Sequence, residues 1–329
     1  MSQLPSRNLA LELVRVTETA AIAASAWVGH GDKNAADAAA VDAMRKMIST
    51  VHMDGTVVIG EGEKDEAPML FNGELVGEGQ GPKVDVAVDP IDGTTLTAKG
   101  MNNAIAVVAL AERGTMFDPS AVFYMEKIVC GPEAAGKIDI EAPVKVNLGR
   151  VAKAKGVPIN DLTVVVLDRP RHDQLSKDIR EAGARIKFIT DGDVAGAVMA
   201  ARDGTGVDLL MGIGGTPEGI ITACAMKCLD GEIQGRLWAR NDEEHRALAE
   251  RGLSASQVLT TNDLVTGNDC FFAATGITDG ELLHGVRFDR RVVRSQSIVM
   301  RSRSKTIRII NSEHPYSSIP VMKSKLSDE

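Results

Sequence analysis

The segment of this chain best suited to chemistry is a mostly apolar run that ends in two aspartates. Residues 84–88, Val-Asp-Val-Ala-Val, are followed by Asp89, a Pro-Ile pair, Asp92, Gly93 and Thr94. The run predicts a buried strand, and the proline and glycine predict a turn after it. Two close carboxylates repel each other unless a cation or a proton lies between them. Because Mg2+ and Mn2+ prefer oxygen ligands, this turn is predicted to form half of a metal site.

Two earlier segments supply further carboxylates. Asp37 falls on the same face of a predicted helix as Val41 and Met44. An acid on an apolar face is costly unless it is paired or bound to a metal; the alternative is that Asp37 only favours the N-terminal end of its helix. Glu61 lies in the run Gly-Glu-Gly-Glu, residues 60–63. The glycines let the backbone approach a ligand closely, and the alternative is an acidic surface turn.

A glycine-rich turn is predicted to bind an anion. Residues 212–219, Gly-Ile-Gly-Gly-Thr-Pro-Glu-Gly, follow a predicted strand and open a helix, with Thr216 as its cap and Pro217 in its first turn. Backbone N–H groups at such a helix start point at bound anions. Glu218 either complements the helix dipole or adds a metal ligand. No lysine follows the glycines, so the turn is not a Walker A loop.

Two further predicted strands end in polar turns. Residues 169–171, Arg-Pro-Arg, follow one strand, and residues 191–193, Asp-Gly-Asp, follow the next. Ligands of α/β sheets bind at the carboxyl ends of the strands, and paired arginines suit bidentate contacts with phosphate. Together with the glycine-rich turn, these segments predict one site at a shared sheet edge. The histidines show no metal-ligand spacing, so His172 and His245 are predicted to be solvated.

The elements that position these turns follow from periodicity. Helices are predicted at residues 8–28 and 34–50, and strands at 56–59, 104–110, 163–167, 185–189 and 207–211. Residues 112–160 are predicted to be rich in loops, whereas strands and helices alternate from residue 162, which favours an α/β fold. We expect two domains: an N-terminal metal-binding α+β domain, residues 1–157, and a C-terminal α/β substrate-binding domain, residues 158–329.

Composition excludes several classes of partner. The chain has 329 residues and a net charge of -8, which argues against binding the nucleic-acid backbone. Aromatic residues make up only 3%, too few for base-stacking surfaces. No run reaches membrane-spanning length and no signal peptide is recognised. The four cysteines form no CxxC pair; we expect Cys224 and Cys228 to be buried, and the compartment to be reducing and cytoplasmic.

The motifs together resemble class II fructose-1,6-bisphosphatase, a bacterial branch of the lithium-sensitive sugar and inositol phosphatase superfamily. The superfamily motif is Asp89-Pro90-Ile91-Asp92-Gly93-Thr94. The branch motifs are Gly31-Asp32-Lys33-Asn34-Ala35-Ala36-Asp37, Val58-Ile59-Gly60-Glu61-Gly62-Glu63, Asp65-Glu66-Ala67-Pro68-Met69-Leu70, Arg169-Pro170-Arg171-His172, Asp191-Gly192-Asp193-Val194-Ala195 and Gly214-Gly215-Thr216-Pro217-Glu218-Gly219. The likeness runs from about residue 9 to about residue 314.

The resemblance implies stacked helix and sheet layers and divalent-metal hydrolysis of the C1 phosphate of fructose-1,6-bisphosphate in gluconeogenesis. By motif match the metal ligands would be Asp37, Glu61, Asp89, Asp92 and Glu218, for Mg2+ or Mn2+. Thr94 would orient or activate the nucleophile, and Asp37 and Glu61 would join it in the catalytic set. Substrate contacts would come from Asp92, Gly93, Thr94, Tyr124, Arg169, Pro170, Arg171, Asp191, Gly192, Asp193 and Gly215. The family motif tolerates Glu at position 92, so the shorter Asp leaves ligation through water open.

Other functions remain open on the same residues. Sedoheptulose-bisphosphatase or inositol-monophosphatase activity fits the same scaffold, and a catalytically silent sugar-phosphate sensor would keep the same pocket. The sensor is the weaker alternative because every expected carboxylate and Thr94 are present. We also expect lithium sensitivity and a homo-oligomer, a dimer or a tetramer.

Overall fold

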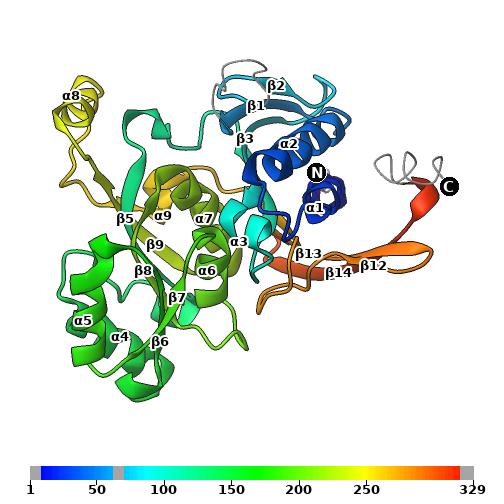
Figure 1. The fold of residues 1–329 in the computed structure, drawn as a ribbon. Coiled ribbons are helices and arrows are strands. Elements are labelled where there is room, and N and C mark those ends of the chain that lie inside the picture. The colour runs from blue at the N-terminus through cyan, green and yellow to red at the C-terminus, as the bar shows by residue number, and fades with distance from the viewer. Residues whose placement is uncertain (1–8, 62–69, 319–329) are drawn as a thin grey trace, which may run out of the picture.

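The computed structural model describes residues 9–61 and 70–318 of the chain (Figure 1). The α-helices are α1 (Ala10–Ser25), α2 (Lys33–Ile48), α3 (Thr94–Lys99), α4 (Val144–Lys155), α5 (Asp173–Glu181), α6 (Asp193–Ala200), α7 (Thr216–Leu229), α8 (Asp242–Glu250) and α9 (Thr261–Leu264). The strands are β1 (Asp54–Ile59), β2 (Leu75–Val76), β3 (Lys83–Asp92), β4 (Ile105–Glu112), β5 (Tyr124–Cys130), β6 (Thr163–Leu167), β7 (Arg185–Ile189), β8 (Leu209–Gly215), β9 (Glu232–Trp238), β10 (Leu259–Thr260), β11 (Phe271–Gly276), β12 (Arg287–Phe288), β13 (Val292–Arg301) and β14 (Thr306–Pro315). Short 3-10 turns lie at Pro119–Ala121, Pro132–Ala134, Ile159–Asp161, Pro170–His172 and Tyr316–Ser318.

The first sheet joins the two ends of the chain. Its strand order is β12-β13-β11-β4-β3-β1-β2, and β14 pairs with β13. β1 runs parallel to β3, and the other pairs are antiparallel. α1 and α2 pack on one face of this sheet, in a core that includes Leu13, Met44 and Val108. Because helices cover both faces, β4 is apolar along nearly its whole length.

The second sheet supplies the predicted edge of polar turns. Its strand order is β10-β9-β5-β8-β6-β7. β6 runs parallel to both β7 and β8, whereas β5 is antiparallel to β8 and β9. The carboxyl ends of β6, β7 and β8 therefore lie at the same edge. α4 and α5 cover the outer face of this sheet, where Leu148 and Ile179 pack against Val164 and Val166.

A shared core joins the two sheets. It includes Ala109 and Phe272 from the first sheet, Val198 of α6, Ile221 of α7 and Leu210 from the second sheet. α6 and α7 thus lie between the sheets, at the centre of Figure 1, with α1 and α2 on one side of the molecule and α4 and α5 on the other. This alternation confirms the α/β fold with stacked helix and sheet layers.

The middle of the chain is the part that periodicity missed. The predicted strands at residues 163–167 and 185–189 coincide with β6 and β7. Residues 112–160 are not loop-rich as predicted, since β5 and α4 occupy much of them. The polar pair Glu126 and Lys127 interrupts the apolar pattern of β5, although Lys127 is buried. β9 and α8 also escaped the prediction.

Three other expectations bear on the organisation of the chain. The boundary between two domains at residue 157 stays a prediction; β5 belongs to the second sheet, and β11 to β14 return to the first. Cys224 and Cys228 are buried as expected, and all four cysteines are free and buried. Within residues 9–61 and 70–318, every helix is too short or too polar to span a bilayer.

Candidate metal and phosphate site

The predicted metal ligands lie around one cavity. Its volume is about 270 Å3, and its wall comes from the ends of β1 and β3 and the first turns of α2, α3 and α7. The lining carboxylates are those of Asp37, Glu61, Asp89, Asp92, Asp191 and Glu218. Thr94 and Gly93 line the same cavity. Residues far apart in the sequence are therefore gathered as the motifs predict, although Glu63 lies outside the described residues.

The break in the β3–β4 ladder places the two aspartates of the central turn. The pairing shifts register between Asp89 and Asp92, where Pro90 cannot donate a backbone hydrogen bond. The Asp89 carboxylate accepts a hydrogen bond from the backbone N–H of Ile91 at 3.0 Å. Gly93 follows at φ 108°, a left-handed conformation that glycine adopts without steric cost. The chain can then turn directly into α3 while the carboxylates of Asp89 and Asp92 stay at the cavity.

Asp37 and Thr94 reach the cavity from the starts of two helices. Asp32 caps α2 by accepting a hydrogen bond from the N–H of Ala35 at 3.0 Å. One turn later Asp37 lies on the buried face of α2, only 9% exposed, which confirms its predicted position on the apolar face. Thr94 is the first residue of α3, and its hydroxyl donates to the carbonyl of Ile91 at 3.3 Å.

The cavity concentrates negative charge, and three of its carboxyl groups have raised pKa values. Burial, followed by the charges of Asp92, Glu61 and Glu218, raises the pKa of Asp89 well above its usual value. Burial and the Asp193 charge likewise raise the pKa of Asp92 and, to a smaller extent, that of Glu218. Among the described residues, Glu218 Oε2 and Thr190 Oγ1 are the buried side-chain oxygens that lack a hydrogen-bond partner.

These observations fit a bound divalent cation. The donors are oxygens only, which suits Mg2+ or Mn2+ better than softer metals. The orphaned Glu218 oxygen and the raised carboxyl pKa values both mark a place where positive charge is missing. The carboxylates line the cavity without converging on one point: across residues 9–61 and 70–318, no three His, Cys, Asp or Glu side chains are close enough together to hold a metal.

The polar turn after β7 connects the two sheets. Asp191 accepts a hydrogen bond from the N–H of Thr95 in α3 at 3.0 Å. In the opposite direction, Asp92 accepts one from the N–H of Ala195 in α6, also at 3.0 Å. Gly192, between Asp191 and Asp193, has φ 78°. The carboxylate cavity and the edge of the second sheet are therefore fixed against each other by reciprocal bonds.

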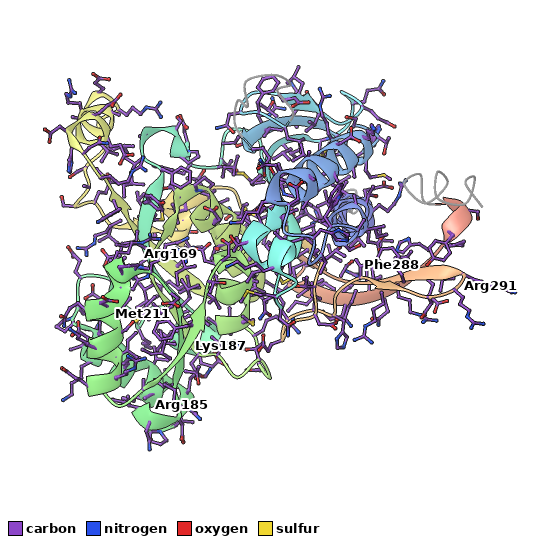
Figure 2. All side chains as sticks on the ribbon, in the orientation of Figure 1. Arg169, Arg185, Lys187, Met211, Phe288 and Arg291 are labelled. Atoms are coloured by element: carbon purple, nitrogen blue, oxygen red, sulfur yellow. The ribbon has the colours of Figure 1, made fainter. Side chains whose placement is uncertain are left out.

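The turn after β6 presents two arginines. Arg169 donates to the carbonyls of Asp168 and Thr190 at 2.9 and 2.8 Å, and Arg171 donates twice to the carbonyl of Ile213, at 3.2 and 2.8 Å. Figure 2 labels Arg169 at the end of the second sheet opposite to Arg185, where β7 begins. The guanidinium of Arg171 also lies over the ring of Tyr124, 5.0 Å from its centre. These residues form a positive surface beside the acidic cavity.

Sequence reasoning missed a lysine inside the site. Lys127 of β5 is 3% exposed, and its ammonium donates to Asp193 Oδ2 at 2.5 Å and to the carbonyl of Gly215 at 3.0 Å. A lysine within an apolar strand was the available sign, because burial of its charge requires a partner. Lys33, whose ammonium donates to the Thr95 hydroxyl at 2.8 Å, was likewise named only within a motif.

The aromatic surroundings of Tyr124 were also not anticipated. Its ring makes edge contacts with Phe123 and Trp238, at centroid distances of 4.8 and 5.8 Å. Arg240 lies over the same ring at 5.3 Å. Phe123 lines the carboxylate cavity although it is 55% exposed. Phe123, Tyr124 and Trp238 thus form an aromatic cluster beside the cavity.

The prediction for His172 was wrong. The residue is only 2% exposed, and its ring makes two hydrogen bonds to backbone groups. His172 directly follows the turn with the two arginines, and for that reason we expected its side chain to be exposed as well. His245, on α8, is exposed as predicted.

Comparison with known proteins gives consistent results over nearly the whole chain. Residues 7–314 match the family described as "Bacterial fructose-1,6-bisphosphatase, glpX-encoded". The chain is 46% identical over 321 residues to fructose-1,6-bisphosphatase 1 class 2 of Escherichia coli strain K12, an alignment that covers 94% of this chain and 95% of that protein. The identity and coverage are the same for fructose-1,6-bisphosphatase class 2 of Escherichia coli O6:H1 and of Shigella flexneri.

Proposed function

The chain belongs to the bacterial, glpX-encoded fructose-1,6-bisphosphatase family, and on that premise we propose how its residues carry out the reaction. The enzyme hydrolyses the C1 phosphate of fructose-1,6-bisphosphate to give fructose-6-phosphate and phosphate, a step of gluconeogenesis. The observation that carries this assignment is the 46% identity to class 2 enzymes over 94% of the chain. Divalent-metal dependence follows from the family.

The metal is Mg2+ or Mn2+, held by Asp37, Glu61, Asp89, Asp92 and Glu218. A divalent cation bound there lowers the pKa of a water ligand and offsets charge on the leaving phosphate. The oxygen-only cavity and the orphaned Glu218 Oε2 support these ligands. Asp92 also accepts the Ala195 N–H, which leaves its other oxygen for direct ligation or for ligation through water.

Thr94 orients the attacking water. Its hydroxyl donates to the carbonyl of Ile91, so its lone pairs are directed elsewhere and can accept a hydrogen bond from a water at the cavity. Asp37 and Glu61 line the same cavity and complete the catalytic set. A covalent enzyme–phosphate intermediate is unnecessary in this arrangement.

The second phosphate and the sugar bind at the edge of the second sheet. Arg169 and Arg171 face the phosphate at C6, which we call the remote phosphate, while Tyr124 packs beside Arg171. The Asp191-Gly192-Asp193 turn and Gly215 contact the sugar. The substrate contacts from the first sheet are Asp92, Gly93 and Thr94, and the remaining contact is Pro170. The hydrogen bonds that join α3 to the turn after β7 support a substrate that spans both sheets.

A substrate panel tests the proposal. Metal-stripped protein is reloaded with Mg2+ or Mn2+, and phosphate release is measured from fructose-1,6-bisphosphate, sedoheptulose-1,7-bisphosphate, inositol 1-phosphate and fructose-6-phosphate. We expect fructose-1,6-bisphosphate to have the highest kcat/KM, because a monophosphate leaves the arginine turn without a partner. Equal or faster turnover of inositol 1-phosphate would defeat the assignment. Absence of release from any substrate would favour a sugar-phosphate sensor.

We propose a homo-oligomer, a dimer or a tetramer, in the cytoplasm. Four free, buried cysteines suit a reducing compartment. We also propose inhibition by lithium, because a small monovalent cation can occupy an oxygen site without supplying the charge that the reaction needs.

A further inference from the structure

The second sheet has an irregular opening beside the arginine turn. β6 and β8 form parallel pairs only at Val164 with Leu209 and Val165 with Leu210. Both strands continue beyond this point, since β6 ends at Leu167 and β8 at Gly215. On its other side β6 stays paired with β7 as far as Leu167. The ladder between β6 and β8 therefore stops before either strand does.

The ring of His172 lies in that opening. Continuing the register would place Leu167 opposite Gly212 and direct the N–H of Ile213 at the carbonyl of Leu167. Instead, His172 Nδ1 is 2.7 Å from the Leu167 carbonyl, and the N–H of Ile213 donates to His172 Nε2 at 2.7 Å. The imidazole thus takes the place of one ladder hydrogen bond: it bridges the two strands with two hydrogen bonds, one at each ring nitrogen.

This bonding assigns one protonation state. A backbone carbonyl only accepts and an N–H only donates, so Nδ1 must carry the proton and Nε2 must be free to accept. An imidazolium carries protons on both nitrogens, and it would direct an N–H at the N–H of Ile213. The ring also fits closely: a Cβ at Gly212, which has φ 131°, would lie 3.0 Å from Nε2.

The same peptide unit anchors Arg171. Its Nε and Nη2 both donate to the carbonyl of Ile213, while the N–H of Ile213 is bound by His172. Two consecutive side chains of the turn thus hold both polar groups of one residue of β8. Movement of Ile213 displaces the guanidinium that lies over Tyr124.

We propose that His172 is a positioning residue for the remote phosphate: its neutral ring holds β6 and β8 at a fixed separation, and its protonation releases β8 and weakens substrate binding. The inference rests on the proposed function of Arg171. It predicts that KM rises at acid pH through His172, with a smaller change in kcat.

The surroundings of the ring favour the neutral form. Burial lowers the pKa of His172, and the neighbouring Arg171 and Arg169 charges lower it further, whereas the Leu167 carbonyl and the Glu126 charge act in the opposite direction. The neutral ring is therefore retained to a lower pH than in a free histidine, whose pKa is about 6.5. Loss of substrate affinity should begin below that value.

Three variants test the proposal by KM and kcat from pH 5 to pH 8. In His172→Gln the side-chain oxygen can still accept from Ile213 but does not titrate, so the rise of KM at acid pH should be smaller than in the wild type. In His172→Asn the side chain is too short to reach Ile213, and KM should rise about tenfold at every pH, the cost of one buried unpaired group. His245→Gln removes an exposed histidine and should follow the wild type. The substrate phosphates titrate identically in all four proteins.

Two inhibitors locate the effect. Fructose-6-phosphate carries only the remote phosphate, so its inhibition constant should follow KM in every variant. Inorganic phosphate, which competes at the reacting position, should show no such change. An acid rise of KM that is identical in His172→Gln and the wild type would overturn the inference, as would a loss of kcat at constant KM in His172→Asn. Absence of wild-type turnover would instead defeat the proposed function.

Discussion

The carboxylate cavity and the arginine turn lie side by side but are stabilised in opposite ways. In the cavity, like charges face one another, three carboxyl pKa values are raised and Glu218 Oε2 has no partner. In the turn, Arg169, Arg171 and His172 each bind backbone carbonyl or N–H groups of the second sheet. The cavity needs a ligand to satisfy it, whereas the turn is organised by the chain itself.

This difference separates two tasks of a bisphosphatase. The reacting phosphate needs positive charge that can assist bond breaking, and a mobile cation supplies it. The remote phosphate only needs to be held, and on the proposed assignment the fixed arginines would do so without reorganisation. The reciprocal bonds from Asp92 and Asp191 keep the two regions at a constant spacing. We therefore expect metal to control chemistry and the turn to control affinity.

Metal removal should give the largest effect and separates the two regions directly. Exhaustive chelation should abolish turnover of fructose-1,6-bisphosphate, and Mg2+ or Mn2+ should restore it, because a cation offsets the neighbouring carboxylate charges that raise the pKa of Asp89. Binding of fructose-6-phosphate to the metal-free protein, measured by titration calorimetry, should persist. If chelation abolished that binding as well, the turn would not be independent of the cavity.

Removal of the Thr94 hydroxyl tests chemistry within the cavity. Thr94→Ala should lower kcat by roughly a hundredfold or more, in the range expected for a group that positions a proton transfer. Thr94→Ser keeps the hydroxyl and should retain measurable activity, although its rotamer is less restricted. Both variants should bind fructose-6-phosphate normally. Wild-type kcat in a folded Thr94→Ala protein would make this residue a turn former only.

Loss of Arg171 tests affinity at the turn. Arg171→Ala should raise KM about tenfold, the scale of a lost charge-assisted hydrogen bond, and should change kcat less, because the remote phosphate is held equally before and during reaction. Arg180 of α5, which lies over the ring of Phe188 in β7, gives a matched control. Arg180→Ala should leave KM unchanged. A fall in kcat alone for Arg171→Ala would move this residue into the chemical step.

The sequence predicted the cavity better than the turn. Asp89, Asp92 and Thr94 stand close together in the chain, so a turn brings them together whatever the fold. Asp37, Glu61 and Glu218 come together around them only through packing between distant elements. Local pattern does not predict that packing, and the resemblance to the family motifs was what predicted a shared site. The strand at 163–167 was clear because its apolar run after Thr163 is unbroken; residues 185–189 were recognised although Lys187 interrupts their apolar side chains.

The sequence could not show the role of His172 or Lys127. His172 is buried only because β6 and β8 separate beyond Leu210, which depends on the pairing between distant strands. Lys127 is tolerated in a buried strand only because Asp193 and the Gly215 carbonyl approach it from two other elements. The local sequence pattern predicts a strand and the turn after it. It does not predict the partner of a buried polar group, because that partner comes from a distant part of the chain.

The smallest predicted effect concerns stability without metal. Burial and the Asp193 charge raise the pKa of Glu218, so its ionised form disfavours folding, and the Lys127 charge offsets this only in part. Glu218→Gln should therefore raise the Tm of the metal-free protein by about 1–2 °C, equivalent to roughly 1 kcal/mol for a chain of this size. Glu243→Gln, at an exposed glutamate in the first turn of α8, should not raise it. With saturating Mg2+ the order should reverse, because the wild type gains binding free energy that the variant largely loses. An equal or lower Tm for metal-free Glu218→Gln would mean that the cavity is not the uncompensated region described above.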